Sequence, residues 1–410
     1  MTHRLRAARR PFGRALAGAA LALGLAACTG GSSDGDGPGA TAGPSSADPT
    51  TAAPTASGSP PGSAGGASGI TIPDIDAAAL AVSGEVASDL PAPWGLAFLP
   101  DGSALVSLRD SGEIRRVVPG PSGVDATVTS LGRVPGVVHS GEGGLLGLAV
   151  GPDFAADRRV YAMYSTREDN RIAYLRLSAD NASLSAPVPV LEGLPTNGNH
   201  LGGRLVFGPD GMLYASTGDA GDTSRSQDRA SLSGKILRLT PDGAVPAGNP
   251  FGDSLVWSMG HRNVQGLAFD AAGRLFASEF GQNTWDELNL IRPGANYGWP
   301  IVEGPSTDSR FMPPLVQWPT SDASPSGIAV VGDAVVVAGL RGERLWVVPY
   351  TPAGASGVSP GRPVALLTGE HGRLRHVCVA PDGSVWVLTN ATDGRGNPQA
   401  GDDRILRLTA

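Results

Sequence analysis

The stretch from residue 198 to residue 219 holds a histidine and an aspartate at the two ends of a predicted hairpin. Two short apolar runs flank a Pro-Asp-Gly turn, which predicts an antiparallel pair of strands. His200 precedes the first strand and Asp219 follows the second, so the pairing makes them neighbours at one mouth of the hairpin. A carboxylate that orients an imidazole is the arrangement that a general base requires. On these residues alone, the alternative stays open that His200 caps a turn and Asp219 binds loop amides.

Arginines form a second group of candidates, because four of them lie in loops next to predicted strands later in the chain. They are Arg262, Arg341, Arg373 and Arg375. Guanidinium groups gathered around His200 would repel each other unless an anion lay among them. A ligand with several carboxylates, or a phosphate, would bind them through paired hydrogen bonds. The alternative is that some of these arginines face away and pair with Asp or Glu; for the set, we predict a shared anionic ligand.

A glycine-rich polar loop at residues 281–283 is a weaker signal for a metal. Such a loop exposes backbone carbonyl oxygens, which suit a hard cation such as calcium. The sequence has no His/Cys spacing typical of zinc. It also has no Gly-x-Ser-x-Gly elbow and no phosphate-binding Gly-Lys-Ser/Thr loop.

The elements that must position these residues follow one repeated pattern of strand, tight turn, strand, loop and strand. Six antiparallel units of this kind predict an all-β, six-bladed β-propeller, in which loops from every blade meet at one end of a central channel. Residues 70–86 are expected to add a strand to the last blade and close the ring; a pair of β-sandwiches is the alternative. The first strands of the six units are predicted at residues 94–99, 146–151, 205–207, 266–270, 327–332 and 375–380.

The chain divides into three segments by composition. Residues 1–28 combine an arginine-rich start with an apolar run ending in Leu-Ala-Ala-Cys, which predicts a lipoprotein-type signal peptide with Cys28 as the lipidated residue. An ordinary signal with a chance cysteine is the alternative. Residues 29–69, rich in Gly, Ser, Pro, Ala and Thr, form a predicted disordered tether, and residues 70–410 the propeller. We expect an exported, extracytoplasmic protein whose membrane contact is its lipid anchor, and the net charge of −7 argues against nucleic acid.

Several motifs, one after another along the blades, resemble those of the glucose/sorbosone dehydrogenase family. This family comprises soluble aldose dehydrogenases that depend on pyrroloquinoline quinone (PQQ) and fold as six-bladed propellers. The resemblance extends from about Leu90 to Leu408, essentially the whole predicted propeller. Its most specific pieces are His200–Arg204, Gly260–Asn263, Asp286–Asn289, Asn296–Pro300 and Arg373–Arg375.

The resemblance implies catalytic roles for residues of this chain. His200 matches the base that takes the proton of the anomeric hydroxyl as hydride passes to the quinone, and Asp219 matches its orienting carboxylate. Arg262 and Asn263 match residues around the reactive quinone carbonyl, where Arg262 would stabilise developing negative charge.

The same resemblance implies the cofactor contacts. Arg373 and Arg375 match the pair that binds the carboxylates of PQQ. The carbonyl oxygens of Gly281 and Gln282 match the ligands of a Ca2+ ion, which would act as a Lewis acid and orient the quinone.

Three positions depart from the family pattern. Arg341 stands where a lysine contacts the cofactor, and Glu142 stands where a glutamine contact is common, so Glu142 adds negative charge near a carboxylated cofactor. Phe280 replaces a polar residue beside the calcium loop. The substrate preference is the property that these departures put in doubt.

The predicted function is therefore oxidation of aldose sugars at the anomeric carbon to lactones, with PQQ and Ca2+ as cofactors and an external electron acceptor. Two alternatives stay open at this point. One is a propeller without redox chemistry that binds sugar or protein, although such a module has no need for the full set of base and arginines. The other is a calcium-dependent lactonase, which requires a central ion held by side chains that this sequence does not supply as a set.

Overall fold

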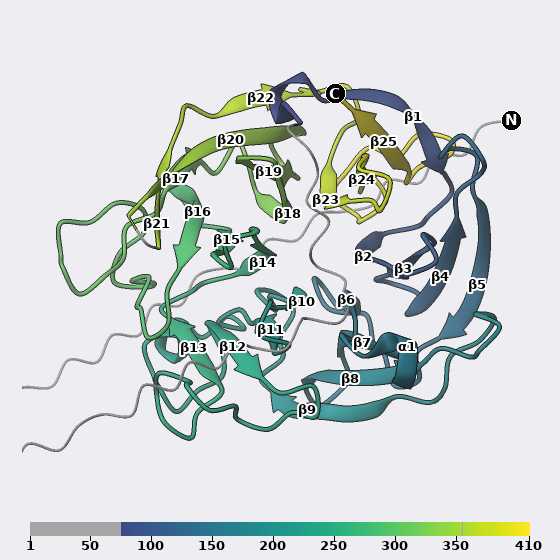
Figure 1. Cartoon of the computed structure of the whole chain (residues 1–410). Helices are drawn as coiled ribbons and strands as arrows, with labels where there is room; N and C mark the ends of the chain where they lie inside the picture. The colour runs from purple at the N-terminus through teal and green to yellow at the C-terminus, as the bar shows by residue number, and fades with distance from the viewer. Residues whose placement is uncertain (1–74, 355) are drawn as a thin grey trace, which may run out of the picture. The chain divides into compact units, whose positions relative to one another are not determined.

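Six antiparallel sheets are arranged around a central axis in the computed structural model, which describes residues 75–354 and 356–410 (Figure 1). The predicted six-bladed β-propeller is thereby confirmed. The signal peptide, Cys28 and the tether all lie outside the described residues. No helix in the described part of the chain is long and apolar enough to cross a membrane.

Each blade is a four- or five-stranded sheet, and the first four blades follow the chain directly. Blade 1 contains β2 (Pro93–Phe98), β3 (Ala104–Leu108), β4 (Glu113–Val118) and β5 (Thr127–Arg133). Blade 2 contains β6 (Leu145–Val150), β7 (Arg159–Ser165), β8 (Asn170–Arg176) and β9 (Val188–Leu194). Blade 3 contains β10 (Leu205–Phe207), β11 (Leu213–Ser216), β12 (Lys235–Leu239) and β13 (Val256–Met259). Blade 4 contains β14 (Val264–Phe269), β15 (Leu275–Glu279), β16 (Trp285–Ile291) and β17 (Val316–Pro319).

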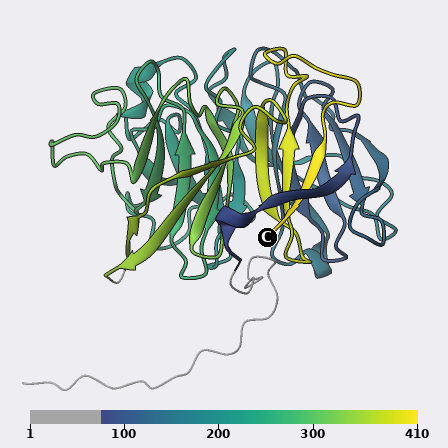
Figure 2. The same cartoon turned by 90° about the horizontal axis from the view of Figure 1, so that it is seen from above.

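The last two blades complete the ring, and the final one joins both ends of the propeller. Blade 5 contains β18 (Pro325–Val331), β19 (Ala334–Gly339) and β20 (Arg344–Ala353), and β20 pairs with both β21 (Gly357–Pro360) and β22 (Val364–Leu366). Blade 6 contains β23 (Leu374–Val379), β24 (Val385–Thr389), β25 (Ile405–Thr409) and, on its outer edge, β1 (Ala81–Ala87). The antiparallel pairing of β1 with β25 confirms the predicted closing strand, which crosses the outside of the ring in Figure 2. The described helices are the single turns η1 (Ala77–Ala79), α1 (Phe154–Asp157) and η2 (Thr223–Ser226).

The hydrophobic core lies between neighbouring blades rather than inside any one of them. Leu288 of β16 and Ile328 of β18, for example, belong to one cluster between blades 4 and 5, while Val106 of β3 and Trp386 of β24 join blades 1 and 6. A single sheet cannot bury both of its faces, so radial stacking supplies the apolar burial that stabilises the fold.

The antiparallel alternation decides which loops share an end of the channel. Within each blade, the segment before the first strand and the loop between the second and third strands lie at the same end. His200, Arg262 and Arg373 precede the first strands of blades 3, 4 and 6, whereas Asp219 lies in a loop between second and third strands. Residues distant in sequence are thus brought to one mouth.

Candidate active site

His200 and Asp219 form a direct hydrogen-bonded pair, as the hairpin geometry predicts. The distance from His200 Nδ1 to Asp219 Oδ1 is 2.8 Å. His200 has a φ of +53°, in the left-handed region, and Ala220 donates a backbone hydrogen bond to its carbonyl oxygen. Gly218 makes this packing possible, because a Cβ there would lie 1.9 Å from that carbonyl oxygen.

Asp219 is fully buried, and both of its carboxylate oxygens are engaged. Oδ1 also accepts from the Gly221 amide at 2.8 Å, and Oδ2 accepts from the indole Nε1 of Trp299 at 2.9 Å. Burial by itself raises the pKa of this carboxyl, but the hydrogen bonds from His200, Gly221 and Trp299 outweigh it and the pKa is lowered. Asp219 is therefore an ionised acceptor, which places the proton of a neutral His200 on Nδ1.

The other ring nitrogen of His200 is the one left for chemistry. Nε2 has one polar neighbour, the Asn199 amide at 3.4 Å, and the His200 side chain keeps 16% of its surface exposed. In the neutral ring that carries its proton on Nδ1, Nε2 is a hydrogen-bond acceptor, and it lies at the same end of the propeller as Arg262. This arrangement can remove a proton from a hydroxyl group.

Arg262 and Asn263 lie next to this pair. The backbone carbonyl of Arg262 accepts from the Asp219 amide at 2.8 Å, and its Nη1 donates to the Phe280 carbonyl at 3.3 Å. Arg262 Nε is buried without a hydrogen-bond partner among the described residues. Burial lowers the pKa of Arg262, against the opposing effect of Asp219, so an added negative charge beside this guanidinium would be stabilised.

Glu142, in the segment before the first strand of blade 2, forms hydrogen bonds with His200 and Asn263. Its Oε2 accepts from the backbone amide of His200 at 3.0 Å and from Asn263 Nδ2 at 3.4 Å. Its Oε1 lies 3.3 Å from Nη2 of Arg395. The extra negative charge that the sequence places here is therefore partly neutralised by an arginine that sequence reasoning did not single out. Asn263 in turn accepts from the Gly202 amide at 3.0 Å through Oδ1.

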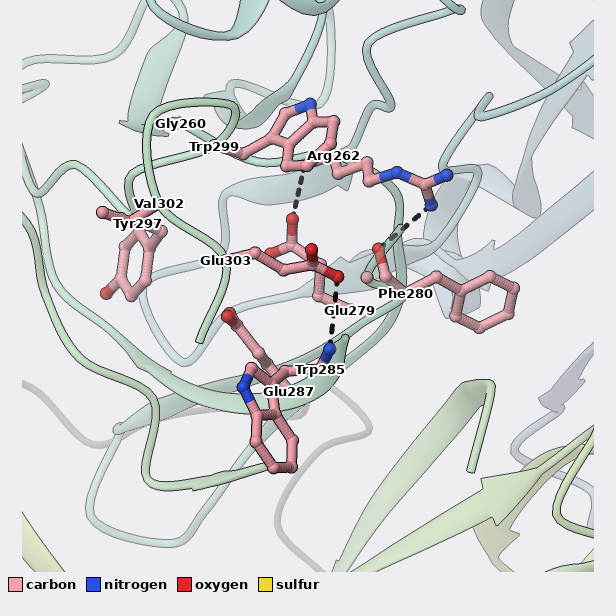
Figure 3. A pocket seen from close by; sticks show the side chains of 11 residues that line it. Gly260, Arg262, Glu279, Phe280, Trp285, Glu287, Tyr297, Trp299, Val302 and Glu303 are labelled. Carbon is pink, nitrogen blue, oxygen red and sulfur yellow. Dashed lines mark hydrogen bonds between the residues drawn. The ribbon is translucent and has the colours of Figure 1, made fainter. Parts of the chain in front are cut away.

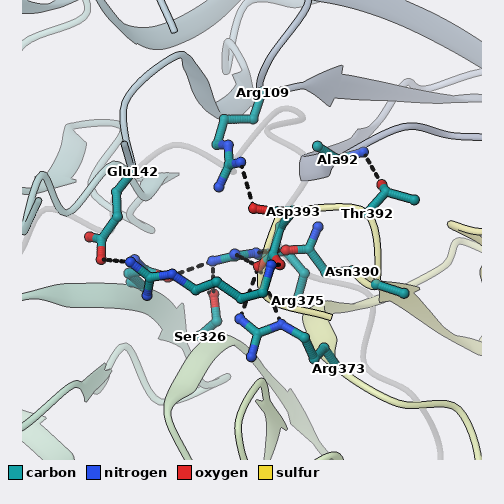
Figure 4. Close-up of polar contacts among 12 residues, drawn as sticks. Ala92, Arg109, Glu142, Ser326, Arg373, Arg375, Asn390, Thr392 and Asp393 are labelled. Carbon is teal, nitrogen blue, oxygen red and sulfur yellow. Dashed lines mark hydrogen bonds and ion pairs between the residues drawn. The ribbon is translucent and has the colours of Figure 1, made fainter. Parts of the chain in front are cut away.

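Arg373 and Arg375 converge on a carboxylate of the protein itself (Figure 4). Asp393 Oδ2 lies 2.9 Å from Arg373 Nη2 and 3.3 Å from Arg375 Nη2. Arg375 also donates to Asn390 Oδ1 and to Gln265 Oε1, both at 2.8 Å. The electrostatic argument that the arginines require an external anion was therefore incomplete, because Asp393 already neutralises part of this pair.

Arg341 takes a different position from the other arginines. It lies in the turn between β19 and β20 and is exposed, whereas Arg373 and Arg375 are buried. The topology thus places all four arginines at one end of the propeller, but they differ in their exposure to solvent.

The loop at Gly281 and Gln282 is organised by a glutamate (Figure 3). Glu303 Oε1 accepts the four consecutive backbone amides of residues 282–285, at distances of 2.7 to 3.2 Å. The carbonyl oxygens of Gly281 and Gln282 accept no hydrogen bond from the described residues. No group of three or more His, Cys, Asp and Glu side chains suited to a metal occurs in residues 75–354 and 356–410, so a cation here would depend on backbone oxygens.

A second histidine–carboxylate pair lies beside the first. His261 Nδ1 is 2.8 Å from Glu279 Oε2, and its Nε2 is 2.9 Å from Ser258 Oγ. The ring is fully buried and stacks on Tyr297 with centroids 4.7 Å apart. Both ring nitrogens are used, so His261 has no free acceptor for a substrate.

Glu279 opens onto a pocket that holds further carboxyl groups (Figure 3). Glu287 lies opposite Glu279 across β15 and β16. Burial and the neighbouring Glu279 raise the pKa of Glu287 to about 7. Burial also raises the pKa of Asp286 to about 6.

Sequence reasoning missed three residues that the structure makes central to the site: Trp299, Glu303 and Asp393. Asp393 had a detectable signal, because it lies in the loop after the second strand of blade 6, as Asp219 does in blade 3. Trp299 belongs to a recognised motif, but nothing in that motif indicates its partner. Glu303 has no local signal, since the amides that it binds lie about twenty residues away.

Known proteins resemble this chain over nearly its whole described part. The family described as Glucose / Sorbosone dehydrogenase matches residues 90–406. A solved structure of the PQQ-bound form of aldose sugar dehydrogenase from Streptomyces coelicolor is 53% identical, with a TM-score of 0.76, and covers 81% of this chain and 98% of its own. Aldose sugar dehydrogenase YliI of Escherichia coli is 33% identical over 78% of this chain and 92% of its own length. Quinoprotein glucose dehydrogenase B of Acinetobacter calcoaceticus is 36% identical over 55% of this chain and 54% of its own length.

Proposed function

Since this chain belongs to the glucose/sorbosone dehydrogenase family, we propose that it is a PQQ- and calcium-dependent dehydrogenase that oxidises aldose sugars at the anomeric carbon to lactones. The observation that carries the proposal is the His200–Asp219 pair, whose partly exposed imidazole lies at the same end of the propeller as Arg262 and has, among the described residues, only a 3.4 Å contact from the Asn199 amide at Nε2. The PQQ-bound relative supports the choice of cofactor.

The residues of the mouth fit a carboxylate-bearing quinone. Burial lowers the pKa of Arg375, although Asp393 opposes it, and burial and the nearby Arg375 lower the pKa of Arg204, so an anion nearby would stabilise both charged forms. Arg204 Nη2 is buried without a partner among the described residues. Arg373, Arg375 and Arg341 would hold carboxylates of the cofactor, and Asn263 and Glu142 would also contact it. The carbonyl oxygens of Gly281 and Gln282 would bind Ca2+.

The protein's own groups account for the proton transfer. The anomeric hydroxyl of the sugar donates its hydrogen bond to His200 Nε2, which takes the proton as the carbonyl forms. Asp219 stabilises the resulting imidazolium through Nδ1, and Arg262 stabilises negative charge that develops opposite the sugar. When bound, PQQ supplies the two-electron acceptor for the hydrogen that leaves C1 with its electron pair. The sugar would leave as the lactone, and an external electron acceptor would take up the electrons.

Export and anchoring are part of the same proposal. The N-terminal pattern that ends at Cys28 supports processing as a lipoprotein, which would place the propeller outside the cytoplasm at the end of the tether. A Cys28→Ala variant is expected to lose lipid labelling and to leave the membrane fraction while the propeller stays folded. Equal membrane retention of both proteins would contradict the anchor.

The activity test uses residues 29–410, purified, mixed with PQQ and Ca2+, and supplied with aldoses and a redox dye. Dye reduction is expected to require both cofactors, to stop with a calcium chelator, and to fall by about 10²- to 10⁴-fold in His200→Ala. A folded protein that neither binds PQQ nor reduces dye would refute the proposal and favour a propeller that only binds.

A further inference from the structure

The indole of Trp299 contacts both Asp219 and Arg262. The side chain is 7% exposed. Its Nε1 donates to Asp219 Oδ2 at 2.9 Å, and its ring centroid lies 5.4 Å from the Arg262 guanidinium carbon. Figure 3 shows the indole beside that guanidinium. The motif at residues 296–300, to which the proposed reaction gives no role, thus reaches the reacting groups.

The hydrogen bond to Asp219 completes the fixation of that carboxylate. His200 and the Gly221 amide both use Oδ1, and among the described residues the indole is the hydrogen-bond donor to Oδ2. A carboxylate held at one oxygen can still rotate, whereas one held at both cannot. The indole N–H also stabilises the ionised form of Asp219, which is the form that orients the imidazole.

The face of the Trp299 indole makes a cation–π contact with the Arg262 guanidinium. A guanidinium within about 6 Å of an aromatic centroid is attracted to the ring face. Arg262 has few other restraints at its tip, because Nη1 makes a 3.3 Å bond to the Phe280 carbonyl and Nε has no partner among the described residues. The ring therefore limits where the guanidinium lies relative to the mouth.

Trp299 is itself held by residues of other loops. Its amide donates to the Gly260 carbonyl at 2.9 Å, and its carbonyl accepts from Gln227 Nε2 at 2.7 Å. Gln227 and Asn296 exchange two side-chain hydrogen bonds at 3.0 and 2.7 Å. The backbone that carries the indole is thus fixed by contacts that do not involve a ligand.

We propose that Trp299 is a positioning residue that couples the His200–Asp219 pair to Arg262, so that base and guanidinium keep one relative geometry. The reaction that this geometry would serve rests on the proposed function, but the coupling itself exists in the protein without cofactor. It is therefore testable with and without turnover.

The test compares Trp299→Phe with Trp346→Phe. Phenylalanine keeps an aromatic face but removes the indole N–H. Trp346 is the matched control, because its Nε1 also makes one hydrogen bond, to the Asp322 carbonyl at 3.0 Å, but in blade 5. Without cofactor, the NMR resonance of the proton between His200 Nδ1 and Asp219 is expected to shift or broaden in Trp299→Phe and to stay unchanged in the control.

With PQQ, Ca2+ and an aldose, kcat/KM of Trp299→Phe is expected to fall about tenfold, mainly through kcat. The acid limb of the pH profile should move to higher pH, because loss of a donor raises the pKa of Asp219. Other charged groups facing this pair are Arg262, Glu142 and Asp222, and all three are retained in the variant. In an Asp219→Asn background the shift of the acid limb should disappear.

An unchanged proton resonance together with an unchanged acid limb would overturn the proposal. If Trp299→Phe does not fold, Gln227→Ala removes an anchor of the indole instead and is expected to give a smaller shift in the same direction; no shift would again overturn it. A shifted resonance in a protein that shows no turnover before mutation would support the coupling and count against the proposed reaction alone.

Discussion

Two histidine–carboxylate pairs lie side by side in this propeller with the same 2.8 Å contact, yet their surroundings give them opposite uses. In the pair of His200 and Asp219, Nε2 has only the Asn199 amide beside it in the described part of the chain, at 3.4 Å, and the side chain is 16% exposed. In the pair of His261 and Glu279, Nε2 is bound by Ser258 and the ring is fully buried. The fate of the second ring nitrogen therefore separates a base from a structural bridge.

The largest contrast is expected between His200→Gln and His261→Gln. The first should lower kcat/KM about 10²- to 10⁴-fold with little change in thermal stability, because it removes the proton acceptor of a partly exposed site. The second should lower the free energy of unfolding by about 3 kcal/mol, because Glu279 would lose its buried partner. Steady-state kinetics and thermal unfolding measured on both variants check this, and equal effects of the two changes would refute the distinction.

The carboxylates should repeat the contrast, with a similar effect on rate and a smaller effect on stability. In Asp219→Asn, one oxygen becomes an NH2 group, so either His200 or Trp299 faces a donor instead of an acceptor. We expect kcat to fall about 10²- to 10⁴-fold as the imidazole loses its orientation. Glu279→Gln should instead cost about 2 kcal/mol of stability, with a smaller loss of rate through Arg262. A stable, inactive Glu279→Gln would contradict the structural role of that pair.

Asp393 extends the comparison to blade 6, where the loop aspartate pairs with arginines rather than a histidine. Burial raises the pKa of Asp393, but Arg375 and Arg373 outweigh it and hold the pKa below its ordinary value. Asp393→Asn should lower the melting temperature of the unloaded protein by several degrees, since two buried guanidiniums lose their counter-ion. Saturating PQQ should then raise the melting temperature more in the variant than in the unchanged protein. An equal rise would show that the cofactor does not reach this pair.

The smallest expected effect concerns Glu287, the carboxyl group opposite Glu279, and how it makes the stability of the fold depend on pH. Glu287 has a folded-state pKa of about 7, above its ordinary 4.5, so the folded protein binds a proton that the unfolded chain has released. This contribution to stability is full below about pH 4.5 and is lost as pH rises to about 7. We expect Glu287→Gln to melt at higher temperature than the unchanged protein at pH 8 and to show a smaller difference at pH 5. The reverse order would contradict the assigned shift.

Much of this architecture follows from local sequence patterns. The six repeats predict the blades and the closing strand, because alternating apolar residues and tight turns specify antiparallel strands wherever they occur. The neighbourhood of His200 and Asp219 follows from one hairpin. Equivalent loop positions also predict that Arg262 and Arg373 share an end of the channel.

The tertiary structure alone decided what each of these groups contacts. His200 and His261 both precede the first strand of a blade, and the sequence offers no local difference that makes one accessible and the other buried. Ser258, which binds Nε2 of His261, is a near neighbour in sequence, but other contacts of the two pairs come from distant segments: Trp299 reaches Asp219 across 80 residues, and Tyr297 covers His261. Strand patterns are set by neighbours along the chain, whereas burial and hydrogen-bond partners are set by packing between blades. For that reason the sequence determined where the candidate base stands, and the folded propeller determined that its ring stays partly exposed.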